Sequence, residues 1–274
     1  MIDLDWGYYK KNGFVVVKNF FSKQVVSKVL EDAKNVFMNQ FINKKYITDK
    51  HDSILTEEEF NERLYRLFKE DSKSLMNCGK QVQHLISLHR LSLDHKIENL
   101  LLKAGLRFPN ISTRPVLYFN HHRLAQKKIF YKVDPHQDWR SMQGSLNSVV
   151  IWVPLINVSR ELGALEVIPG SHLDGLRTNH MDNGFGMVSL SETERFLSVE
   201  LEQGDILLFS SFIIHQSGEN VTDRPRWSCH FRYNDLSEPT FIGRNYPHPY
   251  VYKPQEELIT QGFPTIKDLL CTFA

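Results

Sequence analysis

Residues 205–215 have the sequence DILLFSSFIIH, a long apolar run that ends on a histidine. The run is rich in β-branched and aromatic residues, which favour extended structure, and Gly218 breaks the pattern soon after His215. We therefore predict one strand over residues 205–215, with His215 at its rim. A histidine in that position can offer a neutral imidazole nitrogen to a metal ion if other ligands converge on it.

Two further candidate ligands, His136 and Asp138, lie upstream and two residues apart. In an extended strand, residues i and i+2 point to the same side, so both can reach one ion while Gln137 faces away. Two imidazoles and one carboxylate can occupy one face of a divalent metal and leave the opposite face open, as in non-haem Fe(II) oxygenases. With 12 histidines in the chain, a His-x-Asp triplet alone arises often by chance. The pattern around the triplet therefore decides whether it indicates a metal site.

Strand and turn signals follow the triplet in the order that a double-stranded β-helix requires. Apolar runs at 148–155 and 205–215 flank a segment with Gly and Pro at 161–172, and a further run at 226–233 returns after a turn. The fold class we expect is mainly β with flanking helices, a double-stranded β-helix (jelly-roll, cupin-like) barrel.

The chain is expected to form a single domain over residues 1–274, without linkers or repeats. Helical elements are expected mainly over 22–104, where Ser22 and Thr56 are placed to begin helices, and the β-helix core over about 112–235. Other expected features are helices near 74–89 and 94–104, strands over 14–20 and 114–120, irregular substrate-facing lids at 123–134 and 174–198, and a C-terminal tail, 236–274, with helical pieces near 254–261 and 265–273.

These segments together resemble the phytanoyl-CoA dioxygenase (PhyH) family of Fe(II)/2-oxoglutarate oxygenases. The resemblance covers most of the chain and rests on residues 8–17, His136-Gln137-Asp138, Trp152-Val153-Pro154-Leu155, 163–172, Gly204-Asp205, and His215-Gln216-Ser217-Gly218 through Asn220 to Arg226. It implies a catalytic iron site of His136, Asp138 and His215, with Arg226 gripping the cosubstrate. Residues 8–17 look like the first strand of that family.

The chemistry of the side chains agrees with these implied roles. A guanidinium is always charged and planar, so Arg226 can pair with the distal carboxylate of 2-oxoglutarate. Ser217, two residues from His215, faces the same side of a strand and can donate a hydroxyl to that carboxylate. Arg224 and Arg232 are rivals, and strand parity does not separate Arg232 from Arg226. The resemblance favours Arg226.

Two more residues, Trp152 and Gln137, are candidates for cosubstrate binding. A large indole in an apolar strand is more often a core residue, whereas the resemblance implies that Trp152 lines the 2-oxoglutarate pocket. Gln137 lies between two metal ligands and is included for that reason. By contrast, the adjacent His121 and His122 would face opposite ways on a strand, so we do not expect them to chelate one metal together.

The reaction implied by the resemblance is hydroxylation of a small-molecule substrate by an Fe(II)-dependent dioxygenase. O2 is consumed, and 2-oxoglutarate is decarboxylated to succinate and CO2. Two alternatives stay open: a metal-dependent cupin-type isomerase or epimerase, and a non-catalytic barrel that binds a small ligand. The presence of Arg226 and Ser217 argues against both.

Bulk properties limit the partners. Lys and Arg total 33 against 32 Asp and Glu, a formal charge of +1 that gives no reason to expect nucleic acid binding. The N-terminus is acidic and has no apolar signal core, which predicts a cytoplasmic protein. No run approaches membrane-spanning length, so no membrane partner is expected. We expect a monomer or a homodimer. Three cysteines without a CxxC pair argue against a disulfide framework. The lids contain several basic residues, which could attract an anionic substrate or could equally be solvated surface charge. These residues are Arg123, Lys127, Lys128, Lys132, Arg140 and Arg177.

Overall fold

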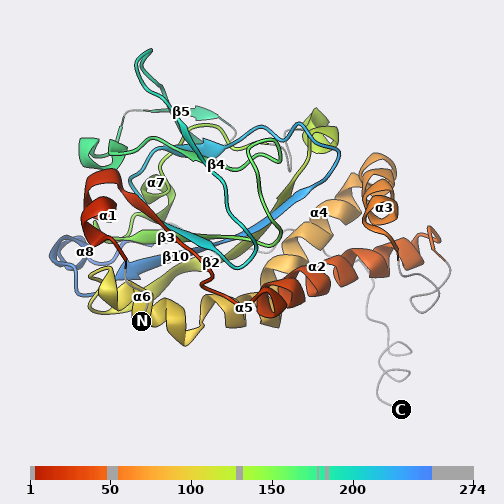
Figure 1. The fold of residues 1–274 in the computed structure, drawn as a ribbon, viewed down its shortest axis with the longest axis horizontal. Helices are drawn as coiled ribbons and strands as arrows, with labels where there is room; N and C mark the ends of the chain where they lie inside the picture. Colours follow the sequence, from red (N-terminus) through yellow and green to blue (C-terminus); the bar gives the residue numbers. More distant parts are fainter. Residues whose placement is uncertain (1–3, 48–54, 128–131, 178, 183–184, 249–274) are drawn as a thin grey trace.

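The computed structural model describes residues 4–47, 55–127, 132–177, 179–182 and 185–248. Helices and antiparallel sheets are both abundant in this part of the chain, so the architecture is mixed α/β (Figure 1). The expected β-sheets with flanking helices are present, but the helices are too extensive for the expected mainly β class. None of the helices described is long and apolar enough to cross a membrane.

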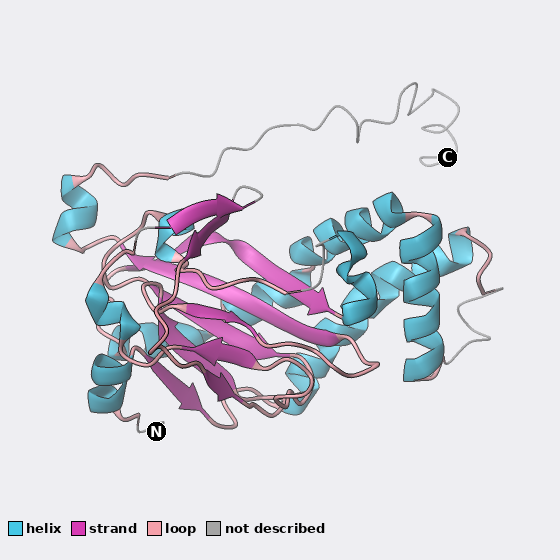
Figure 2. Cartoon of the chain, turned by 90° about the horizontal axis from the view of Figure 1, so that it is seen from above, coloured by secondary structure: helices cyan, strands magenta, loops and turns pink. Residues whose placement is uncertain are grey.

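Most of the strands belong to two antiparallel sheets (Figure 2). The larger has the order β1-β8-β3-β10-β2, and its strands are β1 (Phe14–Val17), β8 (Ile206–Ser210), β3 (Val149–Pro154), β10 (Arg226–Asp235) and β2 (Pro109–Asn120). The smaller has the order β7-β4-β9, with β7 (Leu197–Val199), β4 (Leu165–Val167) and β9 (His215–Ser217). A hairpin of β5 (Asn179–Asp182) and β6 (Phe185–Val188) accompanies them.

The two faces of the larger sheet are covered differently. Alternate side chains such as Ile151, Leu208 and Trp227 share one core with buried residues of the helices. The other alternates, including Trp152 and Phe209, pack in a second core with Leu165, Val167, Val199 and Leu201 of the smaller sheet and its flanks. Because side chains of a strand alternate between faces, each strand contributes to a helix-covered outer face and to an inner face between the sheets.

Helices α2, α5 and α6 run along one side of the larger sheet (Figure 1). The N-termini predicted at Ser22 and Thr56 are confirmed: Ser22 caps α2, and Thr56 with Glu59 forms a capping box at α3. The helices are α1 (Trp6–Asn12), α2 (Lys23–Asn43), α3 (Glu57–Glu70), α4 (Ser72–Gln81), α5 (Ile86–Ser92), α6 (His95–Lys103), α7 (Trp139–Met142) and α8 (Pro239–Gly243), with 3-10 turns at Val82–His84, His122–Lys127 and Ser171–Asp174.

The single strand predicted over 205–215 is wrong in one respect, because it is two strands in different sheets. After β8 the chain turns, with the N–H of Ile213 donating to the carbonyl of Ser210 at 3.0 Å. The Ser210 hydroxyl accepts from the N–H of Phe212 at 3.3 Å, a local bond by which serine competes with strand pairing. His215 therefore begins β9 of the smaller sheet and does not end β8.

Three other expectations change in detail. Residues 8–17 are not one strand, since α1 fills Trp6–Asn12 before β1 begins. The helix expected near 74–89 is divided among α4, a 3-10 turn and α5. The lid segment 174–198 is not irregular, because it contains the β5–β6 hairpin. Cys78 and Cys229 are free and buried, as expected, whereas Cys271 and the helical pieces predicted near 254–261 and 265–273 lie outside the described residues.

Candidate active site

The three predicted metal ligands meet at one point of the structure. His136 and His215 form an antiparallel bridge in which the N–H of each donates to the carbonyl of the other, at 3.0 and 3.1 Å. Their ring centroids lie 4.2 Å apart, and Nε2 of His136 lies 3.5 Å from Oδ1 of Asp138. One ligand atom from each residue lies within 4.8 Å of the other two, so a single ion can contact all three.

The backbone reaches this arrangement by a route other than the extended strand predicted for His136 to Asp138. His136 is held by its bridge, but Asp138 has helical angles, φ −62° and ψ −31°, and immediately precedes α7. Its carbonyl accepts from the N–H groups of Ser141 and Met142 at 3.0 and 3.1 Å. The carboxylate thus reaches the histidines because the chain enters a helical turn directly after the bridge.

Hydrogen bonds determine which ring nitrogen of His136 and of His215 is available to bind a metal. Nδ1 of His136 lies 2.8 Å from the carbonyl of Asp134, and Nδ1 of His215 lies 3.1 Å from the carbonyl of Ile213. A carbonyl oxygen can only accept, so each Nδ1 carries the hydrogen and each Nε2 keeps its lone pair for a metal. Burial lowers the pKa of His215 to about 3, which keeps this ring neutral.

Arg232 binds the carboxylate of Asp138, the third potential metal ligand. Its Nε and Nη2 donate to the two oxygens of Asp138 at 2.9 and 3.2 Å, a paired charge-assisted contact. Burial opposes ionisation of Asp138, but the Arg232 charge and the neighbouring histidines hold its pKa well below the usual range. The ligand is therefore an oriented anion. Sequence analysis assigned Arg232 only as a rival to Arg226 and missed this role.

Arg226, the predicted cosubstrate residue, is almost completely buried, at 1% exposure. It donates to the carbonyl of Gly163 and, from Nη2, to the hydroxyl of Ser217 at 3.4 Å. Within the described residues it has no carboxylate partner, and its Nε has no hydrogen-bond partner. Burial lowers its pKa to about 10. A buried guanidinium without a counter-charge is costly, so this site favours an anion.

Gly163 makes the approach to Arg226 possible. Its φ of +80° lies in the left-handed region, and a Cβ there would lie 2.8 Å from the carbonyl oxygen of Gly218. Only glycine fits both requirements without strain. The backbone that offers its carbonyl to Arg226 can therefore lie directly against the end of β9.

Comparison with known proteins assigns the chain to a family. A family model described as phytanoyl-CoA dioxygenase (PhyH) matches residues 9–228. The chain belongs to the PhyH family. The family lies in the Fe/2-oxoglutarate oxygenase superfamily.

Two curated relatives span most of the chain. A phytanoyl-CoA dioxygenase of Arabidopsis thaliana is 27% identical over 254 residues, which cover 83% of this chain and 87% of that protein. The peroxisomal phytanoyl-CoA dioxygenase of Homo sapiens is 22% identical over 245 residues, which cover 83% of this chain and 67% of that protein.

Solved structures share the fold. The epimerase SnoN from nogalamycin biosynthesis, in complex with Fe3+, alpha ketoglutarate and nogalamycin RO, has a TM-score of 0.57 at 18% identity, covering 91% of this chain and 90% of that one. EctD from S. alaskensis, with 2-oxoglutarate and 5-hydroxyectoine, has a TM-score of 0.51 at 18% identity, covering 85% and 76%.

In this PhyH chain, the inner face of β10 carries a row of polar side chains. Trp227, Cys229 and Phe231 belong to the outer core, so the alternating residues face the space between the sheets. These inner residues are Arg226, Ser228, His230 and Arg232, and Trp152 lies beside His230 on β3. Within the described residues, buried polar atoms here lack hydrogen-bond partners: Nε of Arg226, Oγ of Ser228, both ring nitrogens of His230, Nε1 of Trp152 and both amide atoms of Asn120.

Trp152 and Gln137, the other two predicted cosubstrate residues, differ in position. Trp152 is fully buried on the inner face, and the Arg226 guanidinium lies 5.8 Å from its ring centroid. Gln137 uses its amide elsewhere: Nε2 donates to the carbonyls of Gly175 and Phe212 at 2.8 and 2.6 Å, and Oε1 accepts from the N–H of Arg177 at 3.0 Å. Its contacts therefore hold a loop beside the metal ligands, and a cosubstrate contact for Gln137 stays a prediction.

The predicted lid at 174–198 lies against the metal ligands. Met187 of β6 forms a bridge with His136, and the N–H of Val188 donates to the carbonyl of Pro135 at 2.8 Å. Two basic lid residues are neutralised locally: Arg177 pairs with Asp174 and Glu194, both at 2.6 Å, and Arg123 pairs with Glu62 at 2.7 Å. The side chains of Lys127 and Lys128 lie outside the described part of the chain.

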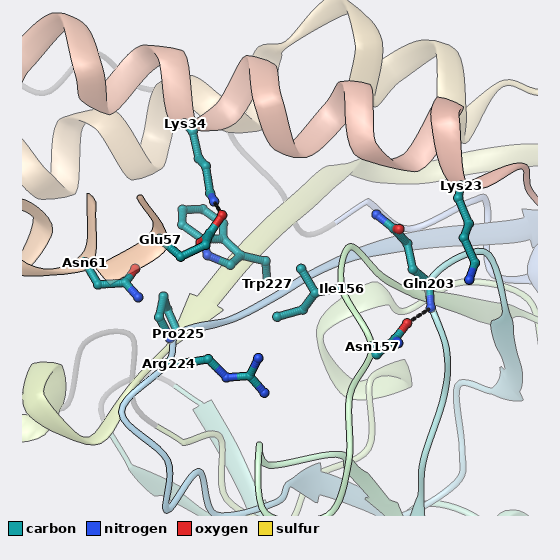
Figure 3. A pocket seen from close by; sticks show the side chains of 10 residues that line it. All are labelled: Lys23, Lys34, Glu57, Asn61, Ile156, Asn157, Gln203, Arg224, Pro225 and Trp227. Carbon is teal, nitrogen blue, oxygen red and sulfur yellow. Dashed lines mark hydrogen bonds and ion pairs between the residues drawn. The ribbon is translucent and has the colours of Figure 1, made fainter. Parts of the chain in front are cut away.

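A groove of about 520 Å³ lies apart from the metal ligands, beside α2 and α3 (Figure 3). Its lining includes Lys23, Lys34, Glu57 and Arg224 but none of the predicted site residues. Lys34 is paired with Glu57, and the exposed Arg224 extends into the groove (Figure 3). Arg224, one of the two rivals to Arg226, is thus directed to a different surface.

Proposed function

We propose that this chain is an Fe(II)/2-oxoglutarate-dependent dioxygenase that hydroxylates a small-molecule substrate. The coupled products are succinate and CO2 from 2-oxoglutarate. The observation that carries the proposal is the buried Arg226, which has no carboxylate partner within the described residues and lies on the same inner face as the arginine that holds Asp138.

The donor set of His136, Asp138 and His215 fits Fe(II). Two neutral imidazoles and one carboxylate offer nitrogen and oxygen ligands of mixed hardness, and three ligands leave coordination positions for other molecules. The chain already orients these ligands through backbone carbonyls and Arg232. Such outer contacts commonly set metal affinity.

The inner face of β10 fits 2-oxoglutarate. In our proposal Arg226 and Ser217 bind the distal carboxylate, and Trp152 forms a wall of the same pocket. The partnerless atoms of Ser228, His230 and Asn120 offer further hydrogen-bond capacity, which buried polar groups normally use. A polar ligand in this space would satisfy them.

When bound, Fe(II), 2-oxoglutarate and O2 supply the oxidising chemistry that no protein side chain can provide. The chain contributes geometry. Arg232 keeps Asp138 ionised and oriented, and Arg226 fixes the position of the cosubstrate.

The finer structural and cellular expectations belong to this proposal. We propose that residues 1–274 form one oxygenase domain and that the two sheets are the two sides of a double-stranded β-helix. The substrate is a small molecule, and its anionic character, a monomeric or homodimeric state and a cytoplasmic location stay predictions. The local neutralisation of Arg123 and Arg177 weakens the argument for an anionic substrate.

A cupin-type isomerase or epimerase without 2-oxoglutarate leaves the buried charge of Arg226 unexplained, and a non-catalytic ligand-binding barrel leaves the convergence of His136, Asp138 and His215 unexplained. Oxidation outcomes other than hydroxylation share the same cofactors.

Anaerobic addition of Fe(II) and 2-oxoglutarate tests the proposal. The intact protein should show a weak visible charge-transfer band, because the keto acid chelates the metal. The band should be lost in His215→Ala and retained in His95→Ala, a control that removes an exposed histidine. Absence of the band from the intact protein would favour the isomerase reading. A succinate-release screen over amino acids, sugar derivatives, lipids and CoA esters, with uncoupled turnover subtracted, would then identify the substrate.

A further inference from the structure

His230 of β10 is a histidine outside the cluster of metal ligands, and it has two unused ring nitrogens. Both nitrogens are buried, and neither has a hydrogen-bond partner within the described residues. A neutral imidazole carries one N–H donor and one lone pair, and buried groups of this kind are normally satisfied. The ring therefore calls for a polar ligand that the protein itself does not supply.

The larger sheet determines where this ring lies. His230 pairs with Trp152 of β3 on one side and with Val116 of β2 on the other. Its two neighbours along β10 belong to the helix-covered core, so the imidazole faces the space between the sheets. His230 and Val116 are partly exposed. Solvent therefore reaches this part of the inner face, and a small molecule can do so too.

The charges around His230 locate it between the two proposed anchor points of 2-oxoglutarate. Arg226, which binds the distal carboxylate in our proposal, lies four residues earlier on the same face of β10. The ring is close enough to Arg226, and also to the metal ligands Asp138 and His215, to feel their charges. A molecule that contacts the metal at one end and Arg226 at the other therefore passes beside His230.

The imidazole is a neutral donor in this setting. Burial lowers the pKa of His230 well below its usual range, and the Arg232 charge lowers it further, against a smaller opposing effect of Asp138. Arg232 itself is engaged with both oxygens of Asp138. The N–H of His230 is thus a donor at the metal end of this row that no described residue uses.

We propose that His230 binds the metal end of 2-oxoglutarate by donating a hydrogen bond to its C1 carboxylate or its keto oxygen. This inference rests on the proposed function and adds to it, because Arg226 and Ser217 account only for the distal carboxylate. The two contacts act at opposite ends of the cosubstrate. Arg226 anchors the far end, and His230 fixes the orientation of the end that meets the metal.

Anaerobic titration of 2-oxoglutarate into the Fe(II)-loaded protein tests the inference. His230→Phe removes both nitrogens and keeps an aromatic ring, and it should raise the 2-oxoglutarate dissociation constant by about 10- to 150-fold, as expected for one lost hydrogen bond to a charged group. The visible charge-transfer band should move to shorter wavelength, because the hydrogen bond stabilises the keto-acid orbital that accepts the electron. Iron affinity in a chelator competition should stay the same, since His230 is not one of the clustered ligands.

Two amide variants separate hydrogen bonding from packing. The amide nitrogen of asparagine can take the place of Nδ1, and that of glutamine can take the place of Nε2. Either His230→Asn or His230→Gln should therefore recover much of the affinity and the band position, and the variant that does so identifies the donating nitrogen. His95→Phe makes the same exchange at an exposed histidine and is the matched control, which should leave both quantities unchanged.

The inference is overturned if His230→Phe keeps the affinity and the band position of the intact protein. It is also overturned if neither amide variant recovers either quantity, because the effect of His230→Phe is then one of packing. Absence of the band from the intact protein would instead remove the proposed function, and this inference with it. None of these readouts depends on turnover.

Discussion

Replacing Arg226 by alanine is expected to weaken 2-oxoglutarate binding severely. The guanidinium is 1% exposed, so water cannot take its place beside the cosubstrate carboxylate. Breaking a buried ion pair costs about 3–5 kcal/mol, which corresponds to an increase of about 150- to 5,000-fold in the 2-oxoglutarate dissociation constant. Arg226→Lys keeps the charge but loses the planar fork, and the loss of one hydrogen bond to a charged group predicts a weakening of about 10- to 150-fold.

The assay is an anaerobic titration of 2-oxoglutarate into the Fe(II)-loaded protein, followed by its visible band. Iron binding should survive in both variants, because Arg226 lies outside the cluster of potential metal ligands. Arg224→Ala is the matched control, since Arg224 is exposed and lines the separate groove. An unchanged dissociation constant in Arg226→Ala, together with a raised one in Arg224→Ala or Arg232→Ala, would refute the assignment.

Three further predictions concern the ligand shell and stability. Arg232→Leu should weaken iron binding by about 10- to 100-fold, because the fork that orients Asp138 is lost; chelator competition measures this, and unchanged affinity would contradict it. Thr56→Ala removes the capping box and should lower the free energy of unfolding by about 1 kcal/mol in a denaturant titration; an unchanged free energy would contradict this. Burial opposes ionisation of Asp205, but hydrogen bonds from Lys18 and two backbone N–H groups lower its pKa. Its stabilising contribution is therefore complete above the unfolded pKa of about 3.9 and is lost as pH falls through the lower folded value. Acid titrations of stability should show this loss flattened in Asp205→Asn.

The chemistry of the site was easier to predict from sequence than its backbone. Residue identity and spacing made His136, Asp138 and His215 candidates, because few side chains suit a divalent metal, and the surrounding pattern with its family resemblance selected them. The backbone conformation that brings these three residues together was not predictable in the same way. A strand pattern through 136–138 does not reveal that Asp138 begins a helical turn, and the apolar run at 205–215 hides the turn after Ser210.

The role of Arg232 was missed because it depends on the pairing register of the strands, which the sequence does not show. Arg232 shares strand parity with Arg226, so both were correctly expected on one face, but parity does not say which of them meets Asp138. The alternation of Arg226, Ser228, His230 and Arg232 was the available signal, since polar residues at every second position of an otherwise apolar strand indicate a polar inner face.

Strand β10 shows why the core and the site depend on each other. Its odd-numbered residues, Trp227, Cys229 and Phe231, are held in the helix-covered core, while Arg226 and Arg232 face the space between the sheets. A slip of one residue in pairing would place guanidinium groups in the apolar core and indole in the polar site. Packing of the helices on the outer face therefore fixes the register that positions both arginines. A core mutation that shifts this register should impair iron and 2-oxoglutarate binding together, whereas a mutation of one arginine should impair one of them.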